Sequence, residues 1–111
     1  MKIKPLEKLK NVAEQLGVPY DIHEHIGKEP EFCVYQVDNI TPDNFADNRA
    51  HARIAHVRLS YIQPIDKSYD ATMWKIIDLM TAEGFTEPLV GIDIQDDTKK
   101  TVLLFSADIK L

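Results

Sequence analysis

The sequence is poor in the residues that build the commonest catalytic and cofactor-binding motifs. It has one cysteine, Cys33, so no disulfide can form within the chain. Its four glycines are dispersed, whereas a P-loop or a dinucleotide-binding fingerprint needs them clustered. No G-x-S-x-G segment is present, and no histidine forms a convincing nucleophilic pair with Cys33. We therefore expect a protein that is not an enzyme and that needs no cofactor, with Cys33 as a small buried hydrophobe.

The sequence also lacks a basic excess and a long apolar run. Eighteen acids stand against 13 bases, which gives a net charge of −5. That balance argues against non-specific binding to nucleic acid, because phosphate backbones are bound by clustered basic residues. No apolar stretch approaches the roughly 20 residues that cross a bilayer, and no signal core follows the basic N-terminus. These features predict a cytoplasmic protein with no membrane partner.

What is present is the pattern of one α+β domain over residues 1–111. The expected elements are a helix at 5–16, strands at 20–26 and 31–37, and a long strand at 51–63. A second helix is expected from about residue 70 to Gly84, followed by strands at 86–94 and 99–109. Because strands adjoin one another in this α-β-β-β-α-β-β order, we expect a mostly antiparallel sheet of four to five strands with both helices on one face.

Apolar periodicity predicts the buried face of each element. The first helix begins at Pro5 and ends before Gly17, and Asp70 or Ser68 is expected to cap the second. The long strand alternates between apolar residues on one face and His56, Arg58 and Ser60 on the other. The residues expected in the core are Leu6, Leu9, Val12, Ala13, Leu16, Ala55, Val57, Leu59, Tyr61, Met73, Ile76, Ile77 and Met80, with Trp74 at the margin of the second helix.

Periodicity vanishes between residues 38 and 50, where Asn, Asp, Thr and Pro dominate around Phe45. This composition predicts a loop, and its length of about 12 residues is long for a compact domain. Loops of that length are commonly functional or become ordered on binding, so we expect residues 38–50 to be a flexible binding segment.

Two groups of residues in the sequence have side chains that can bind metal ions. His23 and His25 are spaced to point to one side of a strand, and His51 and His56 could add ligands. Nothing in the sequence places the two pairs together, so exposed histidines on a solvated strand face are the favoured interpretation. The three acids of residues 93–97 are interpreted as a charged hairpin tip rather than a calcium site.

The segment from Val34 to Ile62 resembles a family of small tail-completion proteins, the tail terminators and tail-to-head joining proteins of siphophages and prophages of Gram-positive bacteria. The resemblance rests on the Val34-Tyr35 pair, the loop core at residues 44–48 (NFADN) and the long strand that follows. A helix that closes with Ala82-Glu83-Gly84-Phe85 and two C-terminal strands extend it over residues 3–109. The loop core is its specific part.

The resemblance implies a non-catalytic α+β protein that forms a ring, commonly a hexamer, at the head-proximal end of the tail tube. Such a ring ends polymerisation of the tube and offers the surface that joins the head connector. The implied partners are other copies of the chain, the major tail protein and the head–tail connector protein. DNA can pass through the ring lumen without specific binding. The implied location is the host bacterial cytoplasm during assembly, and then the virion tail.

Six residues in and after the loop are predicted to make assembly contacts. An Asp–Arg contact between neighbouring subunits would fix their register. The predicted residues are Phe45, Asp47, Asn48, Arg49, Arg53 and Arg58. The alternatives are a neighbouring head–tail connector component, a monomeric acidic protein that binds or regulates another protein, and a small metal-dependent enzyme that uses His23 and His25.

Overall fold

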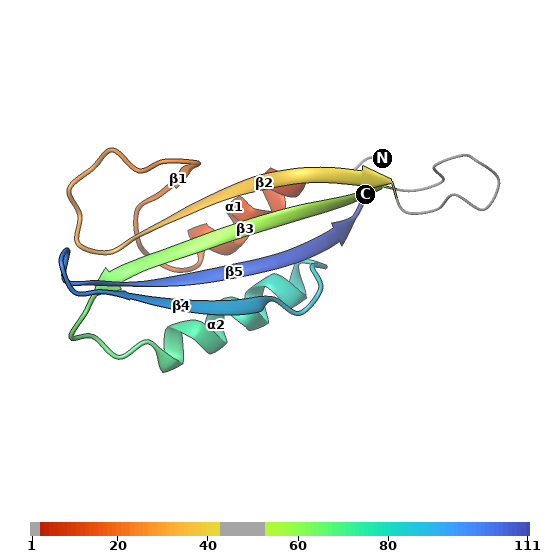
Figure 1. Ribbon diagram of the computed structural model, residues 1–111. Helices are drawn as coiled ribbons and strands as arrows, with labels where there is room; N and C mark the ends of the chain where they lie inside the picture. The colour runs from red at the N-terminus through yellow and green to blue at the C-terminus, as the bar shows by residue number, and fades with distance from the viewer. Residues whose placement is uncertain (1–2, 43–52) are drawn as a thin grey trace.

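A computed structural model describes residues 3–42 and 53–111 as two helices and a five-stranded sheet, in the strand order β1-β2-β3-β5-β4 (Figure 1). The predicted α+β class and the predicted α-β-β-β-α-β-β order are confirmed. Only β1 and β2 pair in parallel, so the sheet is mostly antiparallel. The elements are α1 (Pro5–Glu14), β1 (Tyr20–Ile22), β2 (Phe32–Pro42), β3 (Arg53–Pro64), α2 (Asp70–Ala82), β4 (Leu89–Gln95) and β5 (Lys100–Lys110).

Both helices lie on the same side of the sheet, which we call the helix face (Figure 1). Strand alternation directs every second side chain of β3 to this face, where Leu59 is paired with Tyr35 on β2 and with Phe105 on β5. Ile76 of α2 is buried in the same cluster. The core thus lies between the three central strands and the two helices, as the periodicity predicted.

The opposite side of the sheet, the open face, carries polar side chains along its middle. Gln36, Arg58 and Ser106 occupy one cross-strand row of β2, β3 and β5. His56 and Asp108 occupy the row toward the Pro42 end of β2. The predicted placement of His56, Arg58 and Ser60 opposite the core residues of β3 is therefore confirmed.

The helix ends follow the predicted signals only in part. The structure gives α2 Tyr69 as its N-cap and no side-chain cap hydrogen bond, so the predicted cap by Asp70 or Ser68 is wrong. At the other end, Gly84 has φ 102°, a left-handed conformation that favours glycine. The N–H of Phe85 then donates to the carbonyl of Met80 at 3.1 Å, and the Phe85 side chain is buried in the core.

The predicted loop at 38–50 begins too early, because β2 continues to Pro42. The register of β2 against β3 shifts at Asp38, which is the extra residue of a β-bulge. Beyond the bulge Asn39 pairs with His56 and Ile40 pairs with Ala55. Polar composition suggested a loop here, but the length of β3 supplies pairing partners for these residues. The remainder of the predicted loop, 43–50, lies outside the described residues.

The predicted strand at 20–26 is also shorter, and β1 ends at Ile22. His23 follows with φ 68°, which turns the backbone out of the extended conformation. The N–H of Glu24 donates to the carbonyl of Ile22 at 2.7 Å and closes this turn. His23 and His25 therefore do not lie on a strand face.

Candidate assembly surfaces

The six predicted assembly residues fall into two groups. Phe45, Asp47, Asn48 and Arg49 lie outside the described residues. Arg53 and Arg58 are both exposed on β3, but they lie on opposite faces of the sheet. Arg53 begins β3 on the helix face, paired with Pro42 of β2, whereas Arg58 lies on the open face. These two arginines therefore do not form one site.

Arg58 makes its contact within the chain. Its Nη2 donates to Oδ2 of Asp38, the bulge residue, at 3.2 Å. Asp38 also accepts a hydrogen bond from Nε2 of Gln36 at 2.6 Å. About half of the Arg58 side chain is exposed, so this pair holds the bulge while it leaves the guanidinium accessible from the open face.

A second polar group, which the sequence did not reveal, spans three strands of the open face. His56 on β3 lies between Thr41 on β2 and Asp108 on β5. Its Nε2 is 2.8 Å from the Thr41 hydroxyl, and its Nδ1 is 2.7 Å from the Asp108 carboxylate. The signal that could have revealed it is cross-strand register, which joins residues 52 positions apart.

Apolar side chains are exposed at the β4 edge of the sheet. Ile92 and Ile94 point to the helix face and are 45% and 56% exposed, and Leu89 of the same strand is also exposed. Exposed edge strands are usually protected by charges, prolines or bulges. β4 pairs with β5 in unbroken register and carries one charged residue, Asp93. Within the described residues this is the least protected edge of the sheet.

Trp74 of α2 is also exposed, at 58%. Of the stripe predicted for the core, Ile76, Ile77 and Met80 are buried and Met73 is partly buried against them, whereas Trp74 lies beyond its margin. A large exposed aromatic side chain is typical of a contact residue, since tryptophan is enriched in protein interfaces.

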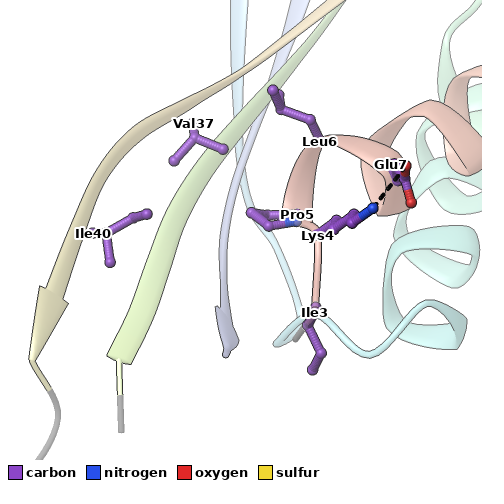
Figure 2. Close-up of a pocket in the computed structure, with 7 residues that line it drawn as sticks. All are labelled: Ile3, Lys4, Pro5, Leu6, Glu7, Val37 and Ile40. Carbon is purple, nitrogen blue, oxygen red and sulfur yellow. Dashed lines mark ion pairs between the residues drawn. The ribbon is translucent and has the colours of Figure 1, made fainter. Parts of the chain in front are cut away.

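An apolar groove of about 640 Å³ lies on the helix face at the β2 side of the sheet (Figure 2). Residues 3–7, where α1 begins, form one wall, and Val37 and Ile40 of β2 form the other. The bulge at Asp38 matters here, because the extra residue moves Ile40 from the open face to the helix face. Ile40 is nonetheless half-exposed, because α1 begins beside it and does not cover it.

His25 is held between two carboxylates in the segment after β1. Its Nδ1 is 2.5 Å from Asp21 and its Nε2 is 2.7 Å from Glu29, while the ring stacks on Phe32 at 4.4 Å. The hydrogen bonds that the two carboxylates accept, chiefly that of Asp21 and then that of Glu29, raise the pKa of His25. Its side chain is only 5% exposed, so the expected exposed histidine is wrong for His25.

The same geometry bears on metal binding. Metal ligands converge on one point, but the two carboxylates lie at opposite nitrogens of the His25 ring. No group of three His, Cys, Asp or Glu residues suited to a metal is found in residues 3–42 and 53–111. The arrangement fastens the segment that follows β1 onto Phe32.

A second fastening lies at the start of β2. Glu31 accepts hydrogen bonds from the hydroxyl of Tyr61 and from Nζ of Lys67, the latter at 2.7 Å. Partial burial opposes ionisation of Glu31, but Lys67 and Tyr61 together lower its pKa. Burial, and then the Glu31 carboxylate, raise the pKa of Tyr61. The contacts hold the loop after β3 against the β2 strand.

Cys33 is fully buried, and burial raises its pKa to about 12. The thiol therefore stays protonated at neutral pH and unreactive, as expected for a small buried hydrophobe.

In the part of the chain that the structure describes, no helix is long and apolar enough to span a membrane.

No family model matches this sequence, and no curated protein is similar to it. Among solved structures, the chain is similar to the sheath/tube terminator of an extracellular contractile injection system, PVC, in its extended state. The TM-score is 0.39 and the sequence identity is 6%. The match covers all of this chain and 58% of the terminator chain, so this chain spans little more than half of that protein's length.

Proposed function

We propose that this chain is a structural tail-completion protein of a phage or prophage. It forms a ring at the head-proximal end of the tail tube, ends the tube there and joins it to the head connector. The observation that carries the proposal is the family-like segment from Val34 to Ile62, which spans most of β2, the residues that connect it to β3, and most of β3. The α+β element order is the one that the resemblance implies.

The distribution of apolar surface supports a protein that works by being bound. The described residues place exposed isoleucines at both margins of the helix face, Ile40 at the β2 side and Ile92 and Ile94 at the β4 side. Apolar surface that stays in contact with water weakens solubility, and clustered apolar surface commonly marks sites of protein association. Two separate margins suit a head-to-tail contact, in which each subunit uses one surface for each neighbour.

The proposed role requires no chemical step. The ring would act through shape and complementary surfaces, and the loop core would set the register between subunits. Asp47 and Arg49 are the residues that we assign to this contact, with Phe45 as its apolar anchor. Asn48, Arg53 and Arg58 complete the proposed assembly set.

Deletion of the gene in the encoding phage tests this function. We expect heads without joined tails, or tails of uncontrolled length, in negatively stained electron micrographs of induced lysates. Expression of the intact chain from a plasmid should restore joined particles of uniform tail length. Normal virions in the absence of the chain would contradict the proposal.

A charge exchange tests the assigned residues more finely. Asp47→Arg and Arg49→Asp should each block assembly by placing like charges together, and the double exchange should restore it in part. Asp66→Arg is a suitable control, because Asp66 lies in the β3–α2 connection, after the Pro64 end of β3. Folding is monitored by circular dichroism, and assembly by particle yield. Normal assembly by both single variants would remove these two residues from the contact.

A monomeric acidic protein-binding module is the second candidate. The observation that favours it is the acidic end of β4, where Asp93, Asp96 and Asp97 follow one another within five positions. Sedimentation at high concentration, with and without the major tail protein, separates the two functions. A chain that stays monomeric in both conditions favours the second candidate.

A further inference from the structure

The sheet has two outer edges that the described residues leave unpaired, and they match in length. β4 offers seven residues, Leu89–Gln95, and it pairs only with β5. On the opposite side, β1 covers β2 only as far as Tyr35, so residues 36–42 form a second seven-residue edge. In an edge strand, alternate N–H and C=O groups point away from the sheet and remain free to pair with another strand.

The two edges also match in the character of their side chains. Ile92 and Ile94 project from β4 on the helix face and are exposed. The apolar groove lies on that same face beside the free edge of β2, with Val37 and Ile40 as its strand wall (Figure 2). An apolar stripe at one edge thus corresponds to an apolar groove at the other.

We propose that β4 of one copy adds in antiparallel orientation to residues 36–42 of a second copy, and that it places Ile92 and Ile94 in the groove of that copy. The sheet then continues from one subunit into the next. Val90 lies beside Pro42, Ile92 beside Ile40, and Ile94 beside Val37, so that each pair projects to the helix face. This inference rests on the proposed head-to-tail assembly and names its contact surfaces.

Strand direction and charge agree with this partner. β2 and β4 run in opposite directions within one sheet, so a neighbour in the same orientation presents β2 antiparallel to β4. The start of β4, just after Glu87, then lies beside Pro42, which is paired with the basic Arg53, and Lys4 lines the adjacent groove. Pairing of β4 with β4 of a second copy about Ile92 would instead bring Glu87 opposite Asp97, with like charges together.

The stagger of this contact permits a closed ring. Leu89 lies level with Gln36 within its own sheet, but the proposed pairing moves it about six residues toward Pro42, or about 20 Å at about 3.3 Å per residue. Four strand spacings of about 4.8 Å carry the sheet about 19 Å sideways in each subunit. Because the shift along the strands about equals the sideways displacement, the strands would tilt by about 45° from the ring axis. This angle is at the upper end of the range found in closed barrels.

Disulfide trapping between two different variants tests the contact. Ile40→Cys and Ile92→Cys are prepared separately, mixed under mild oxidation and examined on non-reducing gels. Residues opposite each other in antiparallel strands lie about 4.5–5.5 Å apart at Cα, within the range that a disulfide spans. We expect a covalent dimer from the mixture and little from either variant alone. Native Cys33 is buried and protonated, so it does not compete.

Each outcome of the trapping experiment has one meaning. A dimer from Ile92→Cys alone, at the yield of the mixture, would show β4 paired with β4 and overturn the proposal. A mixture of Ile26→Cys with Ile40→Cys is the matched control, because Ile26 is highly exposed but lies outside β4. If the chain forms oligomers and the Ile40→Cys and Ile92→Cys mixture gives no dimer, this contact is wrong while the ring survives. A chain that is monomeric at all concentrations and gives no dimer overturns both.

Positive charge introduced at Ile92 and Ile94 gives an independent test of the proposed contact. The double variant Ile92→Lys/Ile94→Lys should keep its circular dichroism spectrum, because both side chains are already exposed. It should weaken self-association at least tenfold in sedimentation, since two ammonium groups would enter an apolar groove. Ile26→Lys should associate as the unchanged chain does. Equal association of the double variant and the unchanged chain would overturn the proposal.

Discussion

The centre and the margins of the helix face follow the same strand alternation but have different surroundings. In the centre, Leu59 and Phe105 are paired across β3 and β5 and buried beneath the helices. At the margins, Ile40 and Ile92 point to the same side of the sheet, yet each is about half-exposed. Alternation thus decides the face to which an apolar residue points, and the reach of the helices decides whether that residue becomes core or stays available for a partner.

Truncation of a central residue should give the largest effect on the stability of the monomer. Leu59→Ala should lower the free energy of unfolding by about 2–5 kcal/mol, because it leaves a cavity in a close-packed region. Ile94→Ala is the matched control at the margin, and it should change stability by less than about 0.5 kcal/mol. Urea unfolding followed by circular dichroism measures both. Equal losses at the two positions would remove the distinction between centre and margin.

Two glycines should respond in opposite directions. Gly84→Ala should destabilise the chain by about 1 kcal/mol, because φ 102° strains a residue with a Cβ atom. Gly91→Ala, in β4, should stabilise it by about 0.5 kcal/mol, because glycine costs entropy in a strand. The new Cβ at position 91 would lie 3.8 Å from Cβ of Leu104, which is ordinary contact. Thermal unfolding measures both, and a loss at position 91 would indicate a constraint on the β4 edge.

Substitutions on the open face should change the stability of the chain less than those above. Arg58→Ala should cost about 0.5 kcal/mol or less, because both partners of the Arg58–Asp38 ion pair are well exposed. A double-mutant cycle with Asp38→Ala isolates the coupling energy between the two side chains. If Arg58→Ala blocks assembly while stability is unchanged, Arg58 acts in the subunit contact, as predicted from the sequence. If Arg58→Ala changes neither assembly nor stability, the Arg58 side chain contributes to neither.

The smallest effect is expected at His25, and it should depend on pH. Because the folded chain raises the pKa of His25, its contribution to stability is complete below the unfolded value of 6.5 and is lost as pH rises through the folded value. The pKa of Glu29 is lowered, first by backbone hydrogen bonding and then by His25, so its contribution is lost as pH falls below 4.5 through the folded value. The clasp, by which we mean the contacts of His25 with Asp21 and Glu29, should therefore stabilise the fold most between pH 4.5 and 6.5.

Thermal unfolding from pH 5.5 to 8.5 measures this dependence. His25→Gln should reduce the loss of stability on the alkaline side, whereas His23→Gln should leave it unchanged, because His23 is exposed and makes none of the contacts of the clasp. Identical pH profiles for His25→Gln and the unchanged chain would show that the clasp does not contribute to folding.

The predictable parts of the fold are those with strong local periodicity. The stripe of α1 around Leu9 and Val12 and the alternation of β3 from Ala55 to Tyr61 both appear as expected. The error at residues 38–42 concerns a feature that depends on contacts distant in the sequence. β2 continues through Asp38 and Asn39 because β3 pairs with them, and local composition carries no information about that partner.

The candidate surfaces also include features that the sequence predicted and features that only the structure revealed. The sequence marked Trp74 as lying at the margin of its helix, and it marked Arg58 as facing away from the core, but it did not reveal either apolar margin. Ile92 and Ile94 have the pattern of core residues, and only the position of β4 at an edge exposes them. Ile40 reaches the groove only because the bulge shifts its parity.

By itself the sequence determined the α+β class, the faces of the main elements and the buried, unreactive state of Cys33. These follow from apolar periods and composition, which act over a few residues. Tertiary structure alone decided that β4 and residues 36–42 form edges with no partner among residues 3–42 and 53–111, that His25 is held between two carboxylates, and that a groove forms beside Ile40. Each of these depends on which strands become neighbours, and that choice is made by the packing of the whole chain.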